Sequence, residues 1–253
     1  MLIAIDHGNK QMKTLHCPPF VSGLTKSSVK PFGKNILKYQ EWFYMLSNER
    51  IPYMRDKTED ESFFVLTLFA IARELEKMGG FSDDVMRIQL AVGLPPVHYG
   101  AQNRIFTEYF AGRDVVQFDY QGKEHAVYIE DVRCYPQAYA AAVTRLKELM
   151  VYPRALIVDI DAVLKDKRIA YPPSVVSIIE QMARDFVDDL INRLRELMLD
   201  LSSGVVVFVG GGAILLQKQI EASGKIGKAV FVEDINANAR GYELLYQSET
   251  MSR

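Results

Sequence analysis

Two aspartates stand at the ends of short apolar runs that are typical of buried strands. Asp6 closes the run at residues 2–6, and Asp159 lies in the run at residues 155–160. In open α/β sheets, ligands bind outside the carboxyl ends of the strands. A carboxylate in that place can hold Mg²⁺, directly or through water. Both aspartates are therefore candidate metal ligands, although an aspartate at a strand end is commonly only part of a turn.

The residues that follow Asp6 could bind a phosphate group. Gly8 would let backbone N–H groups approach a phosphate closely, Asn9 adds a polar side chain, and Lys13 supplies positive charge. His7 could also touch a phosphate, but a local structural role is at least as plausible for a histidine without a partner in the sequence. Taken alone, the segment is only weak evidence for a phosphate site.

Three consecutive glycines, Gly210, Gly211 and Gly212, follow the apolar run at residues 205–209. They would allow a flat ligand to lie against the backbone and would place a helix N-terminus beside it. The segment is not a Walker loop, because no Gly-Lys-Ser/Thr follows, and it is not a complete GxGxxG fingerprint. A tight turn needs fewer than three glycines, so the pattern favours a nucleotide contact.

Gln137 follows Pro136 at the expected start of a helix. A glutamine in such a place could orient a water molecule for attack on a phosphate. Without further support, an exposed glutamine in a first helical turn is the simpler interpretation.

An α/β fold must position these residues, because strand-like and helix-like segments alternate along the chain. We expect strands at residues 2–6, 37–46 (a strand or a hairpin), 86–94, 117–127 (a hairpin around Gly122), 126–132, 155–160, 205–209 and 229–232. We expect helices from a Thr58/Glu61 capping box to Gly79, from Pro136 through Met150, from residues 172–174 onward and at about 236–246, and a loop at 26–38. The helix after Pro172 carries an apolar stripe formed by Val175, Ile178, Ile179, Met182, Phe186, Leu190, Ile191, Leu194 and Leu197. A domain boundary is expected near residues 151–154, which gives domains at 1–150 and 151–253.

The composition of the chain argues against several classes of protein. The chain has 253 residues, of which 49% are hydrophobic and 25% charged, and a net charge of −2. This near-neutral charge argues against a protein that coats nucleic acid through bulk charge. Two cysteines, Cys17 and Cys134, give neither a disulfide framework nor a zinc pattern. With no membrane-spanning apolar run and Asp6 so close to the start, we expect a cytoplasmic protein without a signal peptide or a membrane partner.

The ordered set of segments resembles the actin-like ATPase superfamily. IAIDHGNKQMK, VRCYPQAYAA, VFVGGGAILL and VEDINANARGYELL are similar, in this order, to its first phosphate loop, first connecting helix, adenosine loop and second connecting helix. Within the superfamily the chain looks like the ParM/StbA plasmid-segregation actins of the Firmicute type. The segments DKTEDESFFVLTLFAIARELE and LAVGLPPVHYG extend that likeness, so the resemblance covers nearly the whole chain.

This resemblance implies two RNase H-like domains around a cleft that holds ATP (or GTP) with Mg²⁺, and ADP after hydrolysis. The last helix, at about 236–247, would pack back on the first domain. Members of the family assemble into filaments when ATP is bound, and hydrolysis destabilises them. A small DNA-binding adaptor of the ParR type couples the filament to plasmid DNA, which the filament protein touches only indirectly.

The resemblance also implies roles for individual residues. Asp6 and Asp159 would lie near the metal, and Gln137 would position the hydrolytic water, so these three are the candidate catalytic residues. The remaining candidates would bind the nucleotide: Gly8, Asn9 and Lys13 at the phosphates, and Gly210, Gly211 and Gly212 beside the nucleoside.

The second phosphate loop departs from the family pattern, which reads Asp-Ile/Leu-Gly-Gly-x-Thr-x-Asp. Here Asp159-Ile160 is followed by DAVLK at residues 161–165, without the glycines and the threonine. The β-meander and the first helix that follow in the family are also missing. A deletion, natural or engineered, would truncate the second domain and expose a sheet edge. The other explanation, which we favour because both flanks match the family, is that the sequence joins two stretches across an absent segment. The departure keeps open a second hypothesis, a nucleotide-binding scaffold or filament protein without efficient hydrolysis.

The segment LIVDIDAVLKD also resembles the first motif of haloacid-dehalogenase-type phosphatases. In that interpretation Asp159 is the nucleophile and Asp161 the general acid. However, Ala162 replaces the glycine of that motif, and no later strand ends in the acidic pair that such enzymes use for Mg²⁺. The phosphatase is therefore a remote alternative.

Overall fold

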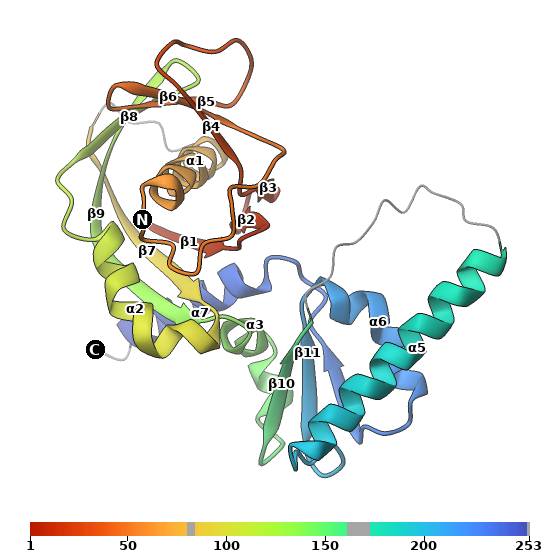
Figure 1. Ribbon diagram of the computed structural model, residues 1–253. Coiled ribbons are helices and arrows are strands. Elements are labelled where there is room, and N and C mark those ends of the chain that lie inside the picture. The colour runs from red at the N-terminus through yellow and green to blue at the C-terminus, as the bar shows by residue number, and fades with distance from the viewer. Residues whose placement is uncertain (80–83, 161–172, 252–253) are drawn as a thin grey trace. The chain divides into compact units, whose positions relative to one another are not determined.

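The computed structural model describes residues 1–79, 84–160 and 173–251, which form two compact units (Figure 1). Unit 1 comprises Met1–Ala140 and Asn238–Arg253, and unit 2 comprises Ala141–Ala237. The chain therefore leaves unit 1 once and returns to it near its end. The division lies earlier in the chain than the boundary expected near residues 151–154. Across the described ranges, every helix is too short or too polar to cross a membrane.

Unit 1 is built on a nine-stranded sheet with the order β3-β2-β1-β7-β9-β8-β5-β6-β4. The strands are β1 (Leu2–His7), β2 (Gln11–Lys13), β3 (Phe20–Val21), β4 (Leu24–Ser27), β5 (Ile36–Tyr39), β6 (Trp42–Leu46), β7 (Met86–Leu94), β8 (Val116–Tyr120) and β9 (Lys123–Pro136). β1, β7 and β9 are parallel, and the other strands pair antiparallel with their neighbours. The carboxyl ends of the three parallel strands consequently lie at one edge, where α/β proteins bind ligands.

Helices cover both faces of the central strands. Alternate strand residues point to opposite sides, and both sets are buried in β1 and β7, so each face needs a covering helix. α1 (Ser62–Lys77) is apolar almost all round and is enclosed by the curved sheet (Figure 1). It packs on Ile3 and Ile5 of β1 in the main core. α7 (Ala237–Met251) packs on the other face, against Ala4 and Ala91, and α2 (Pro96–Phe110) contacts β7 and β9.

Small residues allow α7 to lie close to the sheet. A side chain at Gly93 of β7 would collide with Tyr242 of α7, and one at Gly241 would collide with the backbone of Ala140. The segment that returns from unit 2 is thus held by close packing within unit 1.

Unit 2 contains a parallel three-stranded sheet with the order β10-β11-β12. Its elements are β10 (Ala155–Asp159), β11 (Val205–Val209), β12 (Lys228–Phe231), α4 (Leu146–Leu149), α5 (Pro173–Glu196) and α6 (Gly211–Ala222). In the part of the chain that the structure describes, β10 pairs with β11 only, so it is the edge strand that the sequence predicted. The unusual loop at residues 161–165, including Asp161 and Ala162, lies outside the described residues.

Most predicted elements are present, but two helix starts were wrong. The predicted Thr58/Glu61 capping box is absent, because Thr58 bonds to the carboxylate of Asp56 and the helix begins at Ser62. The helix predicted from Pro136 through Met150 is broken, because β9 continues to Pro136 and Ala138 has a φ of 60°. Only two short helices follow, α3 (Tyr139–Val143) and α4. The predicted loop at 26–38 is also shorter than expected, because its first residues belong to β4 and its last residues to β5.

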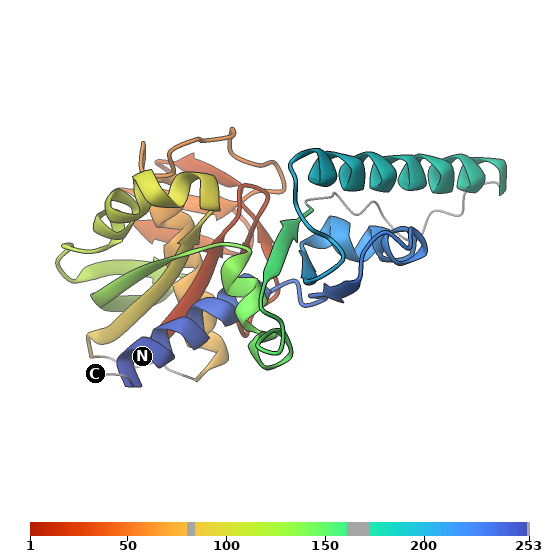
Figure 2. The same cartoon turned by 90° about the horizontal axis from the view of Figure 1, so that it is seen from below.

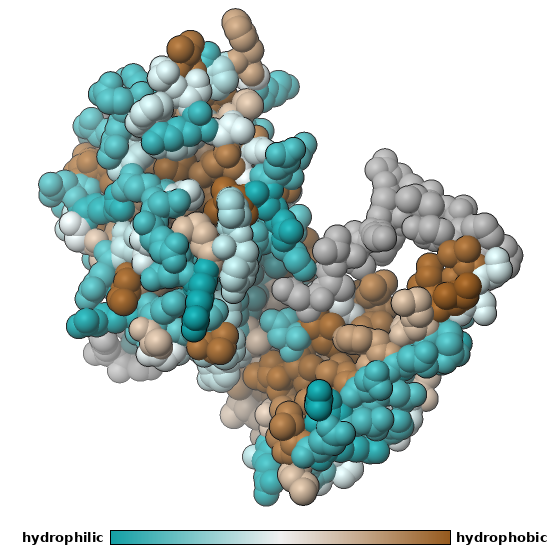
Figure 3. Space-filling view, viewed as in Figure 1, coloured by the Kyte–Doolittle hydropathy of each residue, from teal (hydrophilic) through white to brown (hydrophobic). Residues whose placement is uncertain are grey.

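The apolar stripe predicted for α5 is only partly buried. Ile191 is 1% exposed, and Leu190 and Leu194 are half-buried against the sheet. Exposed apolar side chains instead stand in the first half of the helix, at Ile178, Ile179 and Met182, and near its middle, at Phe186. The reason is that a sheet of three strands is too narrow to cover a helix of 24 residues, and its start extends beyond the strands (Figures 1 and 2). Apolar surface is visible over part of α5 in Figure 3.

Candidate functional site

Asp6 is a buried carboxylate at the carboxyl end of β1 that collects three nitrogen donors. Gln137 Nε2 donates to Asp6 Oδ1 at 2.9 Å, and Asn238 Nδ2 donates to Asp6 Oδ2 at 3.3 Å. Lys13 Nζ lies 3.6 Å from Asp6 Oδ2. Burying a carboxylate is unfavourable unless its charge is compensated and its oxygens are hydrogen-bonded. These contacts thus compensate the burial of Asp6, and a carboxylate in this place is a ligand type that Mg²⁺ prefers.

The β1–β2 hairpin explains how Lys13 reaches Asp6. The two residues are directly paired across the antiparallel strands, so their side chains share one face of the sheet. Gly8 lies in the turn between the strands, where an added Cβ atom would lie 2.5 Å from the carbonyl oxygen of Gln11. The hydroxyl of Ser22 donates to the carbonyl oxygen of Gly8 at 2.5 Å. The turn through Gly8 and Asn9 is therefore tight, and a residue with a side chain would not fit at Gly8.

His7 faces the core and away from any ligand. Its ring is completely buried and packs against Phe106 and Phe110. Its Nε2 lies 2.8 Å from the hydroxyl oxygen of Thr67. Because that hydroxyl donates to the carbonyl oxygen of Phe63, Nε2 carries the proton and donates to Thr67. Burial, together with the charge of Lys57, lowers the pKa of His7 to about 3, so the ring is neutral and its role is structural.

Lys57 is a buried cation behind the β1 turn that sequence reasoning missed. Its ammonium group donates to the carbonyl oxygen of His7 and lies 5.2 Å from the centre of the Phe63 ring. Burial lowers the pKa of Lys57 to about 8, although the negative charge of Asp6 opposes the shift. A single lysine in a loop does not reveal from one sequence that it is buried, because its burial depends on how the loop folds over the sheet.

Asn238 is a second residue of this site that the sequence did not reveal. It begins the returning segment in α7, and its Oδ1 accepts a hydrogen bond of 3.0 Å from the backbone N–H of Ala138. The same side chain donates to Asp6. The segment NANARGYELL suggested only a helix start, which is a common place for asparagine.

The other predicted residues belong to unit 2 and form a separate group. Asp159 ends β10, and Gly210 connects β11 to α6 with a φ of 91°. A Cβ atom at Gly210 would lie 2.6 Å from both Asp159 Oδ1 and the carbonyl oxygen of Ile160. Gly212 N–H donates to that same carbonyl oxygen at 2.8 Å. The structure thus brings Asp159 and the glycines together at the carboxyl ends of β10 and β11.

Both groups fit the binding of a nucleotide with Mg²⁺. Magnesium is usually held by one or two carboxylates together with substrate phosphates and water. Within the described ranges, the structure has no cluster of three or more His, Cys, Asp or Glu residues that could hold a metal ion by itself. Asp6 and Asp159 could each contribute a single carboxylate. The glycine turns, which leave no room for a side chain, could contribute backbone contacts.

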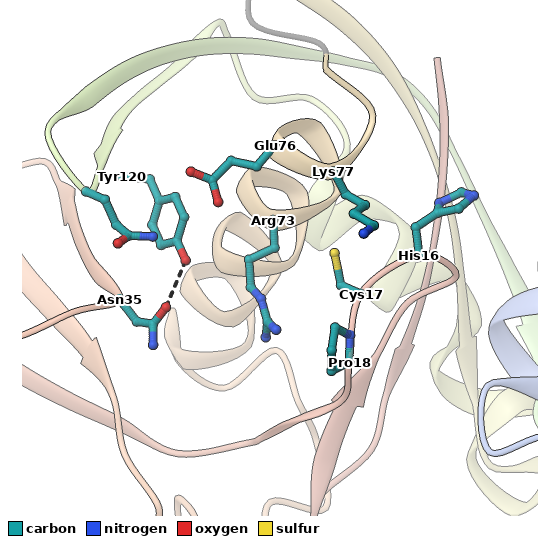
Figure 4. Close-up of a pocket in the computed structure, with 9 residues that line it drawn as sticks. His16, Cys17, Pro18, Asn35, Arg73, Glu76, Lys77 and Tyr120 are labelled. Carbon is teal, nitrogen blue, oxygen red and sulfur yellow. Dashed lines mark hydrogen bonds between the residues drawn. The ribbon is translucent and has the colours of Figure 1, made fainter.

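A separate hollow of about 330 Å³ lies at the C-terminal end of α1 (Figure 4). Arg73, Lys77 and His16 line it together with Tyr120. The predicted nucleotide-binding residues do not line this hollow.

Comparisons with known proteins identify the fold. Residues 44–139 match the family model for the N-terminal domain of actin-like proteins. Solved structures with similar folds include an archaeal actin homologue, Ta0583, at a TM-score of 0.73 and 14% identity, covering 98% of this chain and 99% of that one. The chain has the actin-like fold. The resemblance to ParM-type actins drawn from the motifs is thus confirmed at the level of fold.

Two further solved structures share this fold. The psk41 ParM protein matches at a TM-score of 0.69 and 14% identity, over 99% of this chain and 98% of that one. AlfA from a Bacillus subtilis plasmid, in a filament structure, matches at a TM-score of 0.62 and 14% identity, over 96% and 98% of the two chains. Ta0583 has also been solved in complex with ADP. No curated protein matches the sequence of this actin-like chain.

Proposed function

We propose that this actin-like protein binds ATP with Mg²⁺, assembles into filaments and hydrolyses the nucleotide to control them. The observation that carries the proposal is the Asp6 carboxylate, which is buried at the carboxyl end of β1 and held by amide and ammonium donors. The ADP complex of Ta0583 and the AlfA filament, which share the fold, support nucleotide binding and assembly. We also propose that the protein is cytoplasmic and moves plasmid DNA through a small DNA-binding adaptor of the ParR type.

In this proposal, the residues of unit 1 bind and orient the phosphates. Lys13 neutralises phosphate charge, and the turn at Gly8 and Asn9 offers its backbone at close range. Asp6 would help to hold Mg²⁺, and the ion, when bound, would neutralise charge at the phosphates. Gln137 lies within hydrogen-bond reach of Asp6, so its amide is placed to orient the attacking water.

The residues of unit 2 bind the rest of the nucleotide. Asp159 adds a second carboxylate for the metal, and Gly210, Gly211 and Gly212 lie against the nucleoside. The positive φ of Gly210 supports this role, because a side chain there would collide with Asp159 and the backbone.

Assembly is tested by light scattering and electron microscopy of the full chain with ATP, ADP or no nucleotide. We expect filaments with ATP that become unstable once ADP accumulates. The absence of polymer at any protein concentration would contradict the filament proposal.

Hydrolysis is tested by phosphate release from the Gln137→Ala variant. We expect release to fall by roughly 100-fold, because a misplaced water is a poor nucleophile. Gln117→Ala, at an exposed position on β8, is the matched control. Equal rates in Gln137→Ala and the wild type would instead favour a nucleotide-binding scaffold that assembles without this catalyst.

The phosphatase alternative is not supported, because the fold is actin-like. Its general acid, Asp161, lies outside the described residues. Phosphatase activity that Asp159→Asn abolishes, without ATP-dependent assembly, would reverse this conclusion.

A further inference from the structure

The chain passes between the two units at two places, Ala140/Ala141 and Ala237/Asn238. Asn238 is thus the first residue of unit 1 after the chain returns. Its side chain contacts two segments that are far away in the sequence, β1 through Asp6 and the turn after β9 through Ala138.

The amide of Asn238 uses its two ends for two different partners. Nδ2 donates to Asp6 Oδ2 at 3.3 Å, and Oδ1 accepts from the backbone N–H of Ala138 at 3.0 Å. A carboxylate accepts hydrogen bonds and a backbone N–H donates one, so only a side chain with both a donor and an acceptor can serve both partners.

The turn at Ala138 needs such support. Ala138 is buried and has a φ of 60°, a left-handed conformation that residues with a Cβ atom rarely adopt. Strained backbone persists only where surrounding contacts hold it. The backbone N–H of Gln137 donates to the carbonyl oxygen of Leu94 at 2.8 Å, and the next N–H is held by Asn238.

This turn determines where Gln137 points. It connects β9 to α3, and in that geometry Gln137 Nε2 reaches Asp6 Oδ1 at 2.9 Å. We propose that Asn238 is a positioning residue that holds the Ala138 turn and the Asp6 carboxylate together, and thereby aims Gln137 at Asp6. The inference rests on the proposed function of Gln137 and Asp6.

Anchoring of α7 does not require Asn238. The helix is fixed by Ala239, Tyr242 and Tyr246, which are buried against Ala4 and Ala91 of the sheet. Removing the Asn238 amide should therefore change the orientation of Gln137 while leaving α7 in place.

The first experiment uses the nucleotide-free protein and measures hydrogen exchange at the Ala138 amide. In Asn238→Ala the acceptor is lost, and we expect exchange to become about tenfold faster. Asn103→Ala removes a comparable side-chain bond on α2, to the carbonyl oxygen of Tyr99, and is the matched control. Unchanged exchange in Asn238→Ala would overturn the proposal.

The second experiment measures ATP turnover and the melting temperature of the same variants. We expect Asn238→Ala to lower kcat about tenfold or more with KM within about twofold, because the aim of Gln137 is lost while the phosphate contacts remain. Asn103→Ala should match the wild type. An unchanged kcat in Asn238→Ala would overturn the inference. So would a loss of kcat in both Asn238→Ala and Asn103→Ala that runs parallel to a fall in their melting temperatures, because the loss would then reflect stability alone. If the wild type itself hydrolyses no ATP, the proposed function fails, and hydrogen exchange still decides the role of Asn238.

Discussion

At the scale of single residues, Lys57 shows how burial changes the chemistry of a side chain. Its ammonium group donates to the carbonyl oxygen of His7 and is removed from water. Burial lowers its pKa to about 8, from an ordinary value of 10.5, and the attraction of Asp6 offsets only part of the change. The positive charge behind the proposed phosphate turn is therefore sensitive to mildly alkaline pH.

The stability of the protein should reflect this shift. Between these two pKa values the unfolded chain keeps a proton that the folded protein has released, so the contribution of Lys57 to the free energy of unfolding rises with pH. Relative to Lys57→Met, we expect the wild type to gain about 2 kcal/mol between about pH 7 and about pH 9.5 in urea denaturation. Lys34→Met, at an exposed lysine, is the control. A difference between wild type and Lys57→Met that is constant or falls with pH would contradict this expectation.

At the scale of elements, α5 shows that an apolar stripe need not be buried along its whole length. Periodicity alone predicted one continuous face, but only the part of the helix from Ala183 onward packs on the hydrophobic core of unit 2. Burial depends on the width of the sheet beneath the helix, which no pattern within the helix reveals.

Two identical substitutions in α5 should therefore have different effects. Ile191 is 1% exposed and Ile178 is 60% exposed. We expect Ile191→Ala to lower the free energy of unfolding of unit 2 by about 3 kcal/mol, since it leaves a cavity. Ile178→Ala should change it by less than about 0.5 kcal/mol. Chemical denaturation measures both, and similar losses at the two positions would show that the first half of α5 is covered.

At the scale of the whole molecule, both ends of the chain build unit 1. α7 follows unit 2 in the sequence but packs on β1 and β7 near the N-terminus. Tyr242 of α7 is fully buried beside Gly93, where no side chain would fit. The stability of unit 1 thus depends on a segment that follows unit 2 in the sequence.

This arrangement can be tested on α7. We expect Tyr242→Ala to destabilise unit 1 by about 3 kcal/mol or more, and to increase hydrogen exchange in β1 and β7. Leu244→Ala changes a side chain that is 40% exposed on the same helix and should have little effect. Equal exchange in β1 and β7 for the wild type and Tyr242→Ala would show that α7 does not stabilise the N-terminal strands.

The sequence alone predicted the α/β class, most strands and the residues of the two glycine turns. These features are local, because a buried strand shows as an apolar run and a close backbone approach requires glycine. Local pattern also selected Asp6, Lys13 and Gln137, and the structure brings these three into contact. Their chemical roles are still predictions.

Only the tertiary structure revealed the contacts between distant segments. Asn238 is separated from Asp6 by 232 positions in the sequence, and Lys57 is separated from His7 by 50. The positive φ of Ala138, which ends the helix predicted from Pro136, is also held by a contact with Asn238. The physical reason is the same in each case. Propensity and periodicity act over a few residues, whereas the partners of a buried polar group depend on the path of the whole chain.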